Sequence, residues 1–255
     1  MMAISLLSLS TTQSMRPPLL TVYGTAGVGK TTFGFSAPNP VGLLTEDGLG
    51  LIQATVFPLF RTLPDFLAGM DALINEPHDY ETAVIDSLDW LEPLIWAEVC
   101  RQQGINSIEE VGYGKGYTFA IDLWRNEYIA RLNRLRDERG MGVVQIAHAV
   151  IKRFDSPETE PYDRYEIKLH AKAAALIQEH SDAVLFANYK VATTKSNVGF
   201  GKQVNRAVGT GQRALYTQER PAFLAKNRYN LSPELPLEWN ALQAQLGGQP
   251  IPDQT

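Results

Sequence analysis

The chain has 255 residues, of which 44% are hydrophobic and 20% are charged, with a formal net charge of −5. This composition is globular, and the negative net charge argues against a protein that binds nucleic acid over its whole surface. The single cysteine, Cys100, excludes an internal disulfide, and no run of about 18 apolar residues predicts a membrane span.

Charge is distributed unevenly along the chain. Residues 31–100 hold eleven acidic residues and one basic residue, whereas residues 185–230 hold eight basic residues and one acidic residue. The basic segment indicates a local contact with a polyanion. A solvated hairpin accounts for it equally well, so both interpretations stay open.

The expected elements begin after a flexible leader, residues 1–17, which is mildly apolar but lacks the basic start of a signal peptide. Strands are predicted at residues 19–23, 41–45, 83–85, 142–147 and 183–187, and helices at residues 87–103, 118–139 and 167–180. Alternating helices and strands, with nearly uninterrupted apolar strands, predict a parallel sheet covered on both faces.

The pattern changes after Asn188. Apolar and polar residues alternate there and are punctuated by glycine, which predicts antiparallel β-hairpins. A short helix is expected at residues 237–246, followed by a disordered polar end. The expected division is therefore a main domain at residues 18–232 and a short tail at residues 233–255.

A glycine-rich loop follows the first expected strand. Residues 24–31 read GTAGVGKT and match G-x-x-x-x-G-K-[ST] at every fixed position. Glycines let the backbone curl so that its N–H groups surround an anion, while Lys30 reaches the β- and γ-phosphates and the Thr31 hydroxyl binds Mg²⁺. The predicted cofactors are ATP and Mg²⁺. The expected nucleotide-binding residues are Gly24, Thr25, Ala26, Gly27, Val28, Gly29, Lys30, Thr31 and Thr32.

A carboxylate for the magnesium shell is expected in the segment TAVIDS, where Asp86 ends an apolar strand. Ligands gather at the carboxyl ends of such strands, so Thr31 and Asp86 are the predicted metal ligands. Capping of the next helix is the alternative role for Asp86, although Ser87 can serve as that cap.

Hydrolysis also needs a group that orients or deprotonates water. Glu46 and Asp47 follow the second expected strand, and Glu46 is the candidate base, with Asp47 left open. Gln145 and His148 lie near the end of another strand, where a polar side chain can contact the γ-phosphate or the attacking water. A buried, hydrogen-bonded histidine is an equally good reading of His148.

With these pieces in order, the chain resembles the RecA-like branch of P-loop ATPases, specifically the phage-type AAA nucleotide-binding proteins, some of which anneal or recombine single strands. The resemblance rests on GTAGVGKTTF, TEDGLG, AVIDSLDWLE, GYGKGY, VVQIAHAVIKRFDSPE, the segment 162–189 and AKNRYNL, spanning residues 19 to about 231. It implies a three-layer α/β core, with Glu46 as the catalytic glutamate, Asp86 as the second-motif aspartate and His148 as a sensor.

The resemblance also draws attention to Lys226 and Arg228, which have the spacing of a Lys-x-Arg pair that reaches a neighbouring subunit's nucleotide in ring ATPases of this fold. Alternate residues on a strand point the same way, so both are candidate trans-acting catalytic cations. The alternative is a surface strand with two solvated cations. Self-association into a ring or filament is expected.

Three segments combine aromatic and basic residues in the manner of single-strand DNA sites. They are residues 112–119 (with Tyr113, Lys115 and Tyr117), residues 150–165 (with Lys152, Arg153, Phe154 and Arg164) and residues 194–206 (with Lys195, Phe200, Lys202 and Arg206). Taken singly, each reads rather as an ordinary surface loop, whereas together they favour DNA.

The predicted function is a Mg²⁺-dependent ATPase that acts on single-stranded DNA in phage-type recombination, annealing or repair. The chain looks like a bare core without the extra modules of full recombinases, which favours annealing over strand exchange. The alternative is a nucleotide-dependent switch or small-molecule kinase that does not act on DNA. A cytoplasmic location is expected, in a phage-infected bacterial host or in a bacterium.

Overall fold

The computed structural model describes residues 16–197 and 203–246, without the side chains of residues 191–210. Its centre is a mixed sheet in the order β2-β3-β4-β1-β6-β7-β9. The parallel part runs from β2 to β6. Its strands are β1 (Leu19–Gly24), β2 (Pro40–Leu44), β3 (Thr82–Asp86), β4 (Gly142–Phe154) and β6 (Ala183–Asn197).

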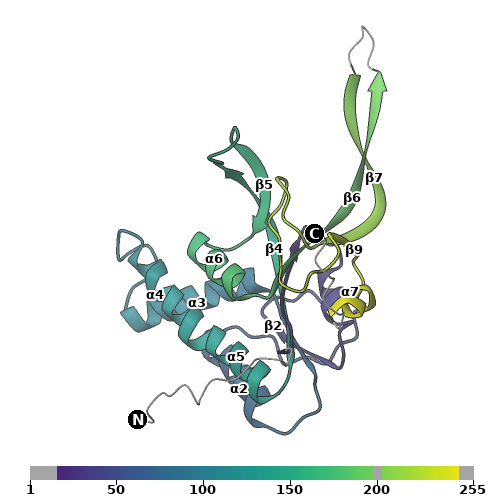
Figure 1. Cartoon of the computed structure of the whole chain (residues 1–255). Coiled ribbons are helices and arrows are strands. Elements are labelled where there is room, and N and C mark those ends of the chain that lie inside the picture. Colours follow the sequence, from purple (N-terminus) through teal and green to yellow (C-terminus); the bar gives the residue numbers. More distant parts are fainter. Residues whose placement is uncertain (1–15, 198–202, 247–255) are drawn as a thin grey trace, which may run out of the picture.

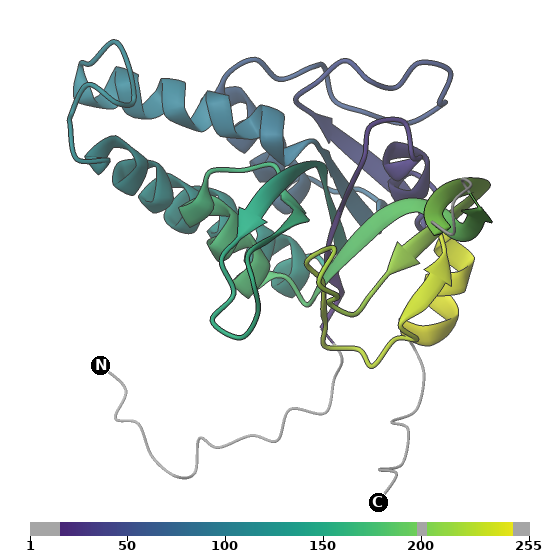
Figure 2. The same cartoon turned by 90° about the horizontal axis from the view of Figure 1, so that it is seen from above.

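Helices cover both faces of this sheet, as Figures 1 and 2 show. One face carries α2 (Leu63–Asn75), α3 (Leu88–Gln103), α4 (Lys115–Leu123), the π-helical turn Trp124–Ile129, α5 (Ala130–Glu138) and α6 (Ala171–His180). The other carries α1 (Lys30–Gly34) and α7 (Trp239–Leu246). The predicted three-layer α/β fold is therefore confirmed.

Strand β1 shows why its sequence is apolar throughout. Leu19 and Tyr23 belong to the larger hydrophobic core, whereas Leu20 and Val22 belong to the core on the opposite face, and all four are fully buried. Successive strand residues point to opposite faces, so a strand covered on both sides needs apolar residues at every position.

The predicted antiparallel hairpins after Asn188 are present. Strand β7 (Gln203–Tyr216) pairs with β6, and the two strands extend beyond the body of the sheet (Figure 1). Strand β9 (Glu234–Pro236) pairs with β7, and the short β8 (Lys226–Asn227) pairs with the beginning of β6.

The structure corrects three of the predicted elements. Strand β4 does not end near residue 147 but continues to Phe154, because it pairs with β5 (Tyr162–Ile167). The expected helix at 167–180 therefore begins only at Ala171. The 118–139 helix starts earlier, at Lys115, and helix α2 was not predicted, although Thr62 caps it by accepting a bond from the Asp65 N–H.

The C-terminal segment packs against the sheet as far as residue 246. Strand β9 extends the sheet, and the Trp239 ring on α7 packs 5.5 Å from the Phe33 ring on α1. The division at residue 232 stays a prediction, and the expected leader and disordered end lie largely outside the described residues. Among the described residues, no helix combines the length and apolarity needed to cross a bilayer.

Candidate nucleotide site

The glycine-rich loop, residues 24–29, joins β1 to α1 in the conformation that an anion nest requires. Gly27 and Gly29 have φ angles of 72° and 106°, in the left-handed region that glycine adopts without strain. At Gly24, a Cβ atom would lie 2.0 Å from the Ala187 carbonyl oxygen on β6, so any larger residue would push the two strands apart. Both constraints fit a loop whose backbone N–H groups surround a phosphate.

Lys30 lies across this loop rather than in solvent. Its side chain is 6% exposed, and Nζ donates to the carbonyl oxygens of Gly24 at 3.1 Å and Thr25 at 2.9 Å. Burial lowers the pKa of Lys30, while nearby carboxylates, Asp86 first among them, oppose that shift. The ammonium group is thus held beside the loop, where phosphate oxygens are the partners it would gain.

Thr31 and Asp86 are brought together, as predicted for a magnesium site. The Thr31 hydroxyl donates to Asp86 Oδ2 at 2.7 Å, and Asp86 is 3% exposed at the carboxyl end of β3. Burial raises the pKa of Asp86 to about 6, and the charge of Glu46 adds to that shift. The Asp86 carboxylate is buried with too little positive charge around it, and it is hydrogen-bonded to a hydroxyl. Two such oxygen groups fit the donor set of a hard cation.

Glu46 lies near the same site because hydrogen bonds hold the residue after β2, Thr45, to the carboxyl end of β3. The Thr45 N–H donates to the Asp86 carbonyl at 2.9 Å, and the Thr45 hydroxyl bonds the N–H and C=O of Ser87 at 3.0 and 2.7 Å. Glu46 is half-buried and close enough for its charge to act on Asp86, Lys30 and His148. Asp47 is exposed.

His148 lies directly opposite Gly24 in the pairing of β4 with β1, which places it beside the start of the phosphate loop. Its backbone N–H donates to Asp89 Oδ1 at 2.9 Å, and its Nδ1 lies 3.0 Å from Asp89 Oδ2. The hydrogen bond to Asp89 raises the pKa of His148. Burial opposes ionisation of Asp89, yet the bonds from His148 bring its pKa down to about 2.

Asp89 received no role from the sequence, although it lies three residues after Asp86 in the segment IDSLD.

The expectation for Gln145 was wrong. Because β4 continues to Phe154, Gln145 is a mid-strand residue in the core, where it accepts from the Tyr128 hydroxyl at 2.7 Å and donates to Thr21 Oγ1 at 3.0 Å.

Lys226 and Arg228 lie away from this chain's own phosphate loop. Strand β8 pairs with Ala183 and Val184, whereas the loop begins opposite Ala187, about 10 Å further along β6. Lys226 Nζ donates to the carbonyls of Gln178 and Glu179, both at 2.8 Å, at the end of α6. Arg228 Nη2 is 3.4 Å from the Glu179 carbonyl, so the two side chains do point the same way.

A hollow of about 500 Å³, here called the aromatic cleft, adjoins the site between α3 and the β4–β5 hairpin. Asp89 forms part of its wall, together with Trp90, Trp96, Lys152, Lys168 and His170. Tyr117 contacts one of these lining residues, because its ring stacks on His170 with centroids 4.1 Å apart.

The three segments predicted to contact DNA have different outcomes. Lys152 lines the aromatic cleft, Tyr117 stacks on its lining residue His170, and Tyr113 is fully exposed. Arg164 is engaged within the fold, because it lies 3.8 Å over the Phe154 ring and donates to Glu166 in the hairpin and to Glu219 outside it, at 2.9 Å each. Arg153 pairs with Asp155 at 3.4 Å. The side chains of Lys195, Phe200, Lys202 and Arg206 lie outside the described part of the chain.

The family model of the AAA_24 AAA domain matches residues 16–229. The SPbeta prophage-derived uncharacterized protein YorG of Bacillus subtilis (strain 168) is 26% identical over 137 residues, 51% of this chain and 41% of that protein. The chain thus matches less than half the length of that relative.

The crystal structure of the flagellar accessory protein FlaH from Methanocaldococcus jannaschii aligns with 86% of this chain and 84% of its own, at 9% identity and a TM-score of 0.35. The family model, by contrast, spans strands β1 to β8, including the phosphate loop and the Asp86 strand. The chain therefore belongs to the AAA_24 family of AAA domains, with the core of a RecA-like P-loop ATPase.

Proposed function

We propose that this protein binds ATP with Mg²⁺, hydrolyses it, and couples hydrolysis to single-stranded DNA held in the aromatic cleft, in phage-type recombination, annealing or repair. The observation that carries the proposal is the position of Asp89. Its carboxylate holds His148 beside the phosphate loop and also lines the aromatic cleft.

The nucleotide half of the proposal assigns one task to each residue. Lys30 neutralises phosphate charge, Thr31 and Asp86 hold the cation, and Glu46 orients or deprotonates the attacking water. His148 reports the γ-phosphate through a proton that Asp89 stabilises. When bound, Mg²⁺ neutralises the charge that develops on the transferred phosphoryl group.

The DNA half rests on the chemistry of the aromatic cleft. Trp90 is 52% exposed at its edge, which is unusual for so large an apolar side chain. Lys152 and Lys168 supply positive charge beside it. Stacking aromatics next to cations are what sequence-tolerant binding of single strands requires, whatever the net charge of the whole protein.

Asp89 joins the two halves physically. Lys168 Nζ lies 3.5 Å from Asp89 Oδ2, the same oxygen that faces His148 Nδ1. If a DNA phosphate binds Lys168, the lysine moves away from Asp89. His148 is then the remaining partner of that carboxylate, and the Asp89–His148 hydrogen bond becomes stronger. Occupancy of the cleft would then alter the charge and position of His148 at the γ-phosphate.

A nucleotide switch or small-molecule kinase remains the second candidate, because a 500 Å³ cleft has the size of a small-ligand site. A kinase lid would need arginines that reach the phosphates. In the 150–166 hairpin, however, both Arg153 and Arg164 are paired with carboxylates. This favours DNA over a phosphoryl acceptor.

Self-association is part of the proposal, since the trans role of Lys226 and Arg228 requires a neighbouring subunit. Lys226→Ala should abolish cooperative ATPase activity while leaving nucleotide binding nearly intact. Normal cooperative turnover in that variant would remove the trans role. We further propose that the protein acts in the cytoplasm of a bacterium or of a phage-infected host.

The test is the ATPase rate with and without single-stranded DNA, with Lys30→Ala as the blank. Stimulation by DNA is expected in the wild type and should be lost in Asp89→Asn, which keeps the aromatic side chains and the lysines of the cleft and should therefore still bind DNA. Arg61→Ala, which removes an exposed cation outside the cleft, is the matched control. A wild-type rate indifferent to DNA would overturn the coupling and turn attention to a phosphoryl acceptor.

A further inference from the structure

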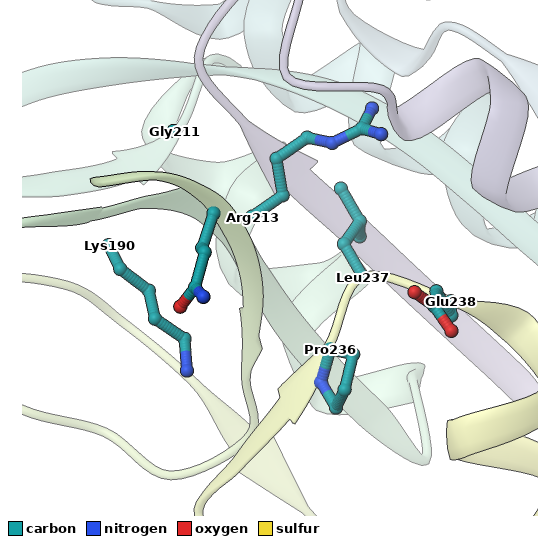
Figure 3. Close-up of a pocket in the computed structure, with 7 residues that line it drawn as sticks. Lys190, Gly211, Arg213, Pro236, Leu237 and Glu238 are labelled. Atoms are coloured by element: carbon teal, nitrogen blue, oxygen red, sulfur yellow. The ribbon is translucent and has the colours of Figure 1, made fainter. Parts of the chain in front are cut away.

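A second groove lies beside the phosphate loop, on the face of the sheet that carries α1 and α7. It follows β7 and residues 236–240. It consists of two adjoining hollows of about 350 and 430 Å³, which share Arg213, Leu237 and Glu238. Figure 3 shows the larger hollow, with Arg213 extending away from Lys190. Gly29 and Thr32 line the smaller hollow, so the groove is continuous with the phosphate loop.

Arg213 is pressed against the loop itself. Its Nη1 lies 3.4 Å from the Val28 carbonyl oxygen, and a Cβ atom added at Gly29 would come within 2.5 Å of the same nitrogen. Gly29, the last glycine of the motif, is therefore needed for two reasons: its positive φ angle and the space that the Arg213 guanidinium occupies. Arg213 is an exposed residue that lines both hollows, so a ligand in the groove can contact its planar group.

The groove combines an apolar floor with polar walls. Leu237 is buried, and it belongs to the core that contains Phe33 and Trp239 beneath the groove. The exposed side chains of Thr32, Glu238 and Asn240 line its sides. A flat, partly polar ring fits such a site, because it can lie on an apolar floor under a planar cation while its exchangeable hydrogens bond to oxygens.

We infer that this groove holds the base and ribose of the nucleotide whose phosphates bind the loop, with Arg213 against the plane of the base. The inference rests on the proposed nucleotide binding and adds the nucleoside site. Glu238, as a carboxylate, accepts hydrogen bonds from amino or hydroxyl groups of the nucleoside.

The test separates the nucleoside from the phosphates. Binding of Mg·ATP and of Mg·tripolyphosphate is measured calorimetrically for the full chain and for Arg213→Ala. We expect the Kd of ATP to rise about fivefold or more, which corresponds to a partly exposed cation–π contact, and that of tripolyphosphate to change less than about twofold.

Arg220→Ala is the matched control, because Arg220 lies over the Tyr216 ring at 5.5 Å and outside the groove. Equal weakening of both ligands by Arg213→Ala would place the guanidinium on the phosphates and overturn the inference, as would no weakening of either. Failure of the proposed function is distinct: the wild type would then bind neither ligand, and both ideas would fall.

A second measurement does not depend on a variant. Wild-type protein is photolabelled with 8-azido-ATP, digested, and the modified peptide is sequenced, with excess ATP as competitor. Labelling that ATP suppresses is expected within residues 236–240 or at Arg213. Suppressible labelling confined to helix α3 or the β4–β5 hairpin would overturn the nucleoside site.

Discussion

Asp86 shows a conflict between stability and function at a single residue. A carboxyl group that is 3% exposed, with a pKa of about 6 against its ordinary 3.8, carries a charge that folding disfavours at neutral pH. The group is protonated in both states below pH 3.8, and the folded state binds the extra proton between pH 3.8 and about 6. The free energy of unfolding therefore falls as pH rises through this window.

Asp86→Asn should stabilise the protein at pH 7.5, in the absence of nucleotide and Mg²⁺, by roughly 2–3 kcal/mol, because it removes the buried charge while keeping an acceptor for Thr31. Denaturant unfolding at pH 7.5 and pH 4 measures this gain, which should shrink at the lower pH. The same variant should lose Mg²⁺-dependent hydrolysis. Equal stabilisation at both pH values would show that the charge is not the cause.

Glu46 and Asp47 differ in their surroundings, although they are adjacent in the sequence. Only for Glu46 does the structure show a charge acting on Asp86, Lys30 and His148. Glu46→Gln should lower kcat about 100-fold or more while leaving the Kd of ATP within a few fold, as expected for loss of a general base. Asp47→Asn is its matched control, and a larger loss in that variant would exchange the two assignments.

Strand β4 shows how one element serves three parts of the molecule. Gln145 bonds to Tyr128 and Thr21 in the core, His148 lies opposite Gly24, and Lys152 lines the aromatic cleft. The strand is long enough to do this because β5 supplies hydrogen bonds beyond the sheet. Any movement of the β4–β5 hairpin therefore acts on the strand that carries His148.

Strand β8 has a role within the chain that can be measured separately from any role between subunits. Lys226 caps the end of α6 with two hydrogen bonds to its carbonyls, where a cation also interacts favourably with the helix dipole. Lys226→Ala should lower the free energy of unfolding by about 1 kcal/mol. Unfolding of the monomer at low concentration measures this, with Lys115→Ala at the start of α4 as control.

At the scale of the whole molecule, the sequence predicts features that depend on neighbouring residues. The phosphate loop, the Asp86 strand and the alternating apolar strands are local patterns, and the fold they predict is confirmed. Asp89 and His148 are 59 residues apart, and they meet because β3, which ends three residues before Asp89, pairs with β4. Arg213 similarly reaches Val28, 185 residues away, through the pairing of β7 with β6.

The charge of the whole molecule limits how DNA can bind. With a net charge of −5, long-range attraction is weak, so the proposed binding in the cleft would depend on the few cations there. Two of these, Lys152 and Lys168, line the cleft. Because each neutralised phosphate of a single strand contributes about −0.7, a plot of log K against log salt should have a slope of about −1.4.

Lys168→Ala should make that slope shallower by about 0.7, since one phosphate contact is lost, whereas Arg61→Ala should leave it unchanged. Fluorescence anisotropy of a labelled oligonucleotide at a series of salt concentrations measures both. A wild-type slope steeper than about −3 would require contacts outside the aromatic cleft. It would shift the DNA site to the basic residues of the β6–β7 hairpin, in which case Lys168→Ala would no longer change the slope measurably.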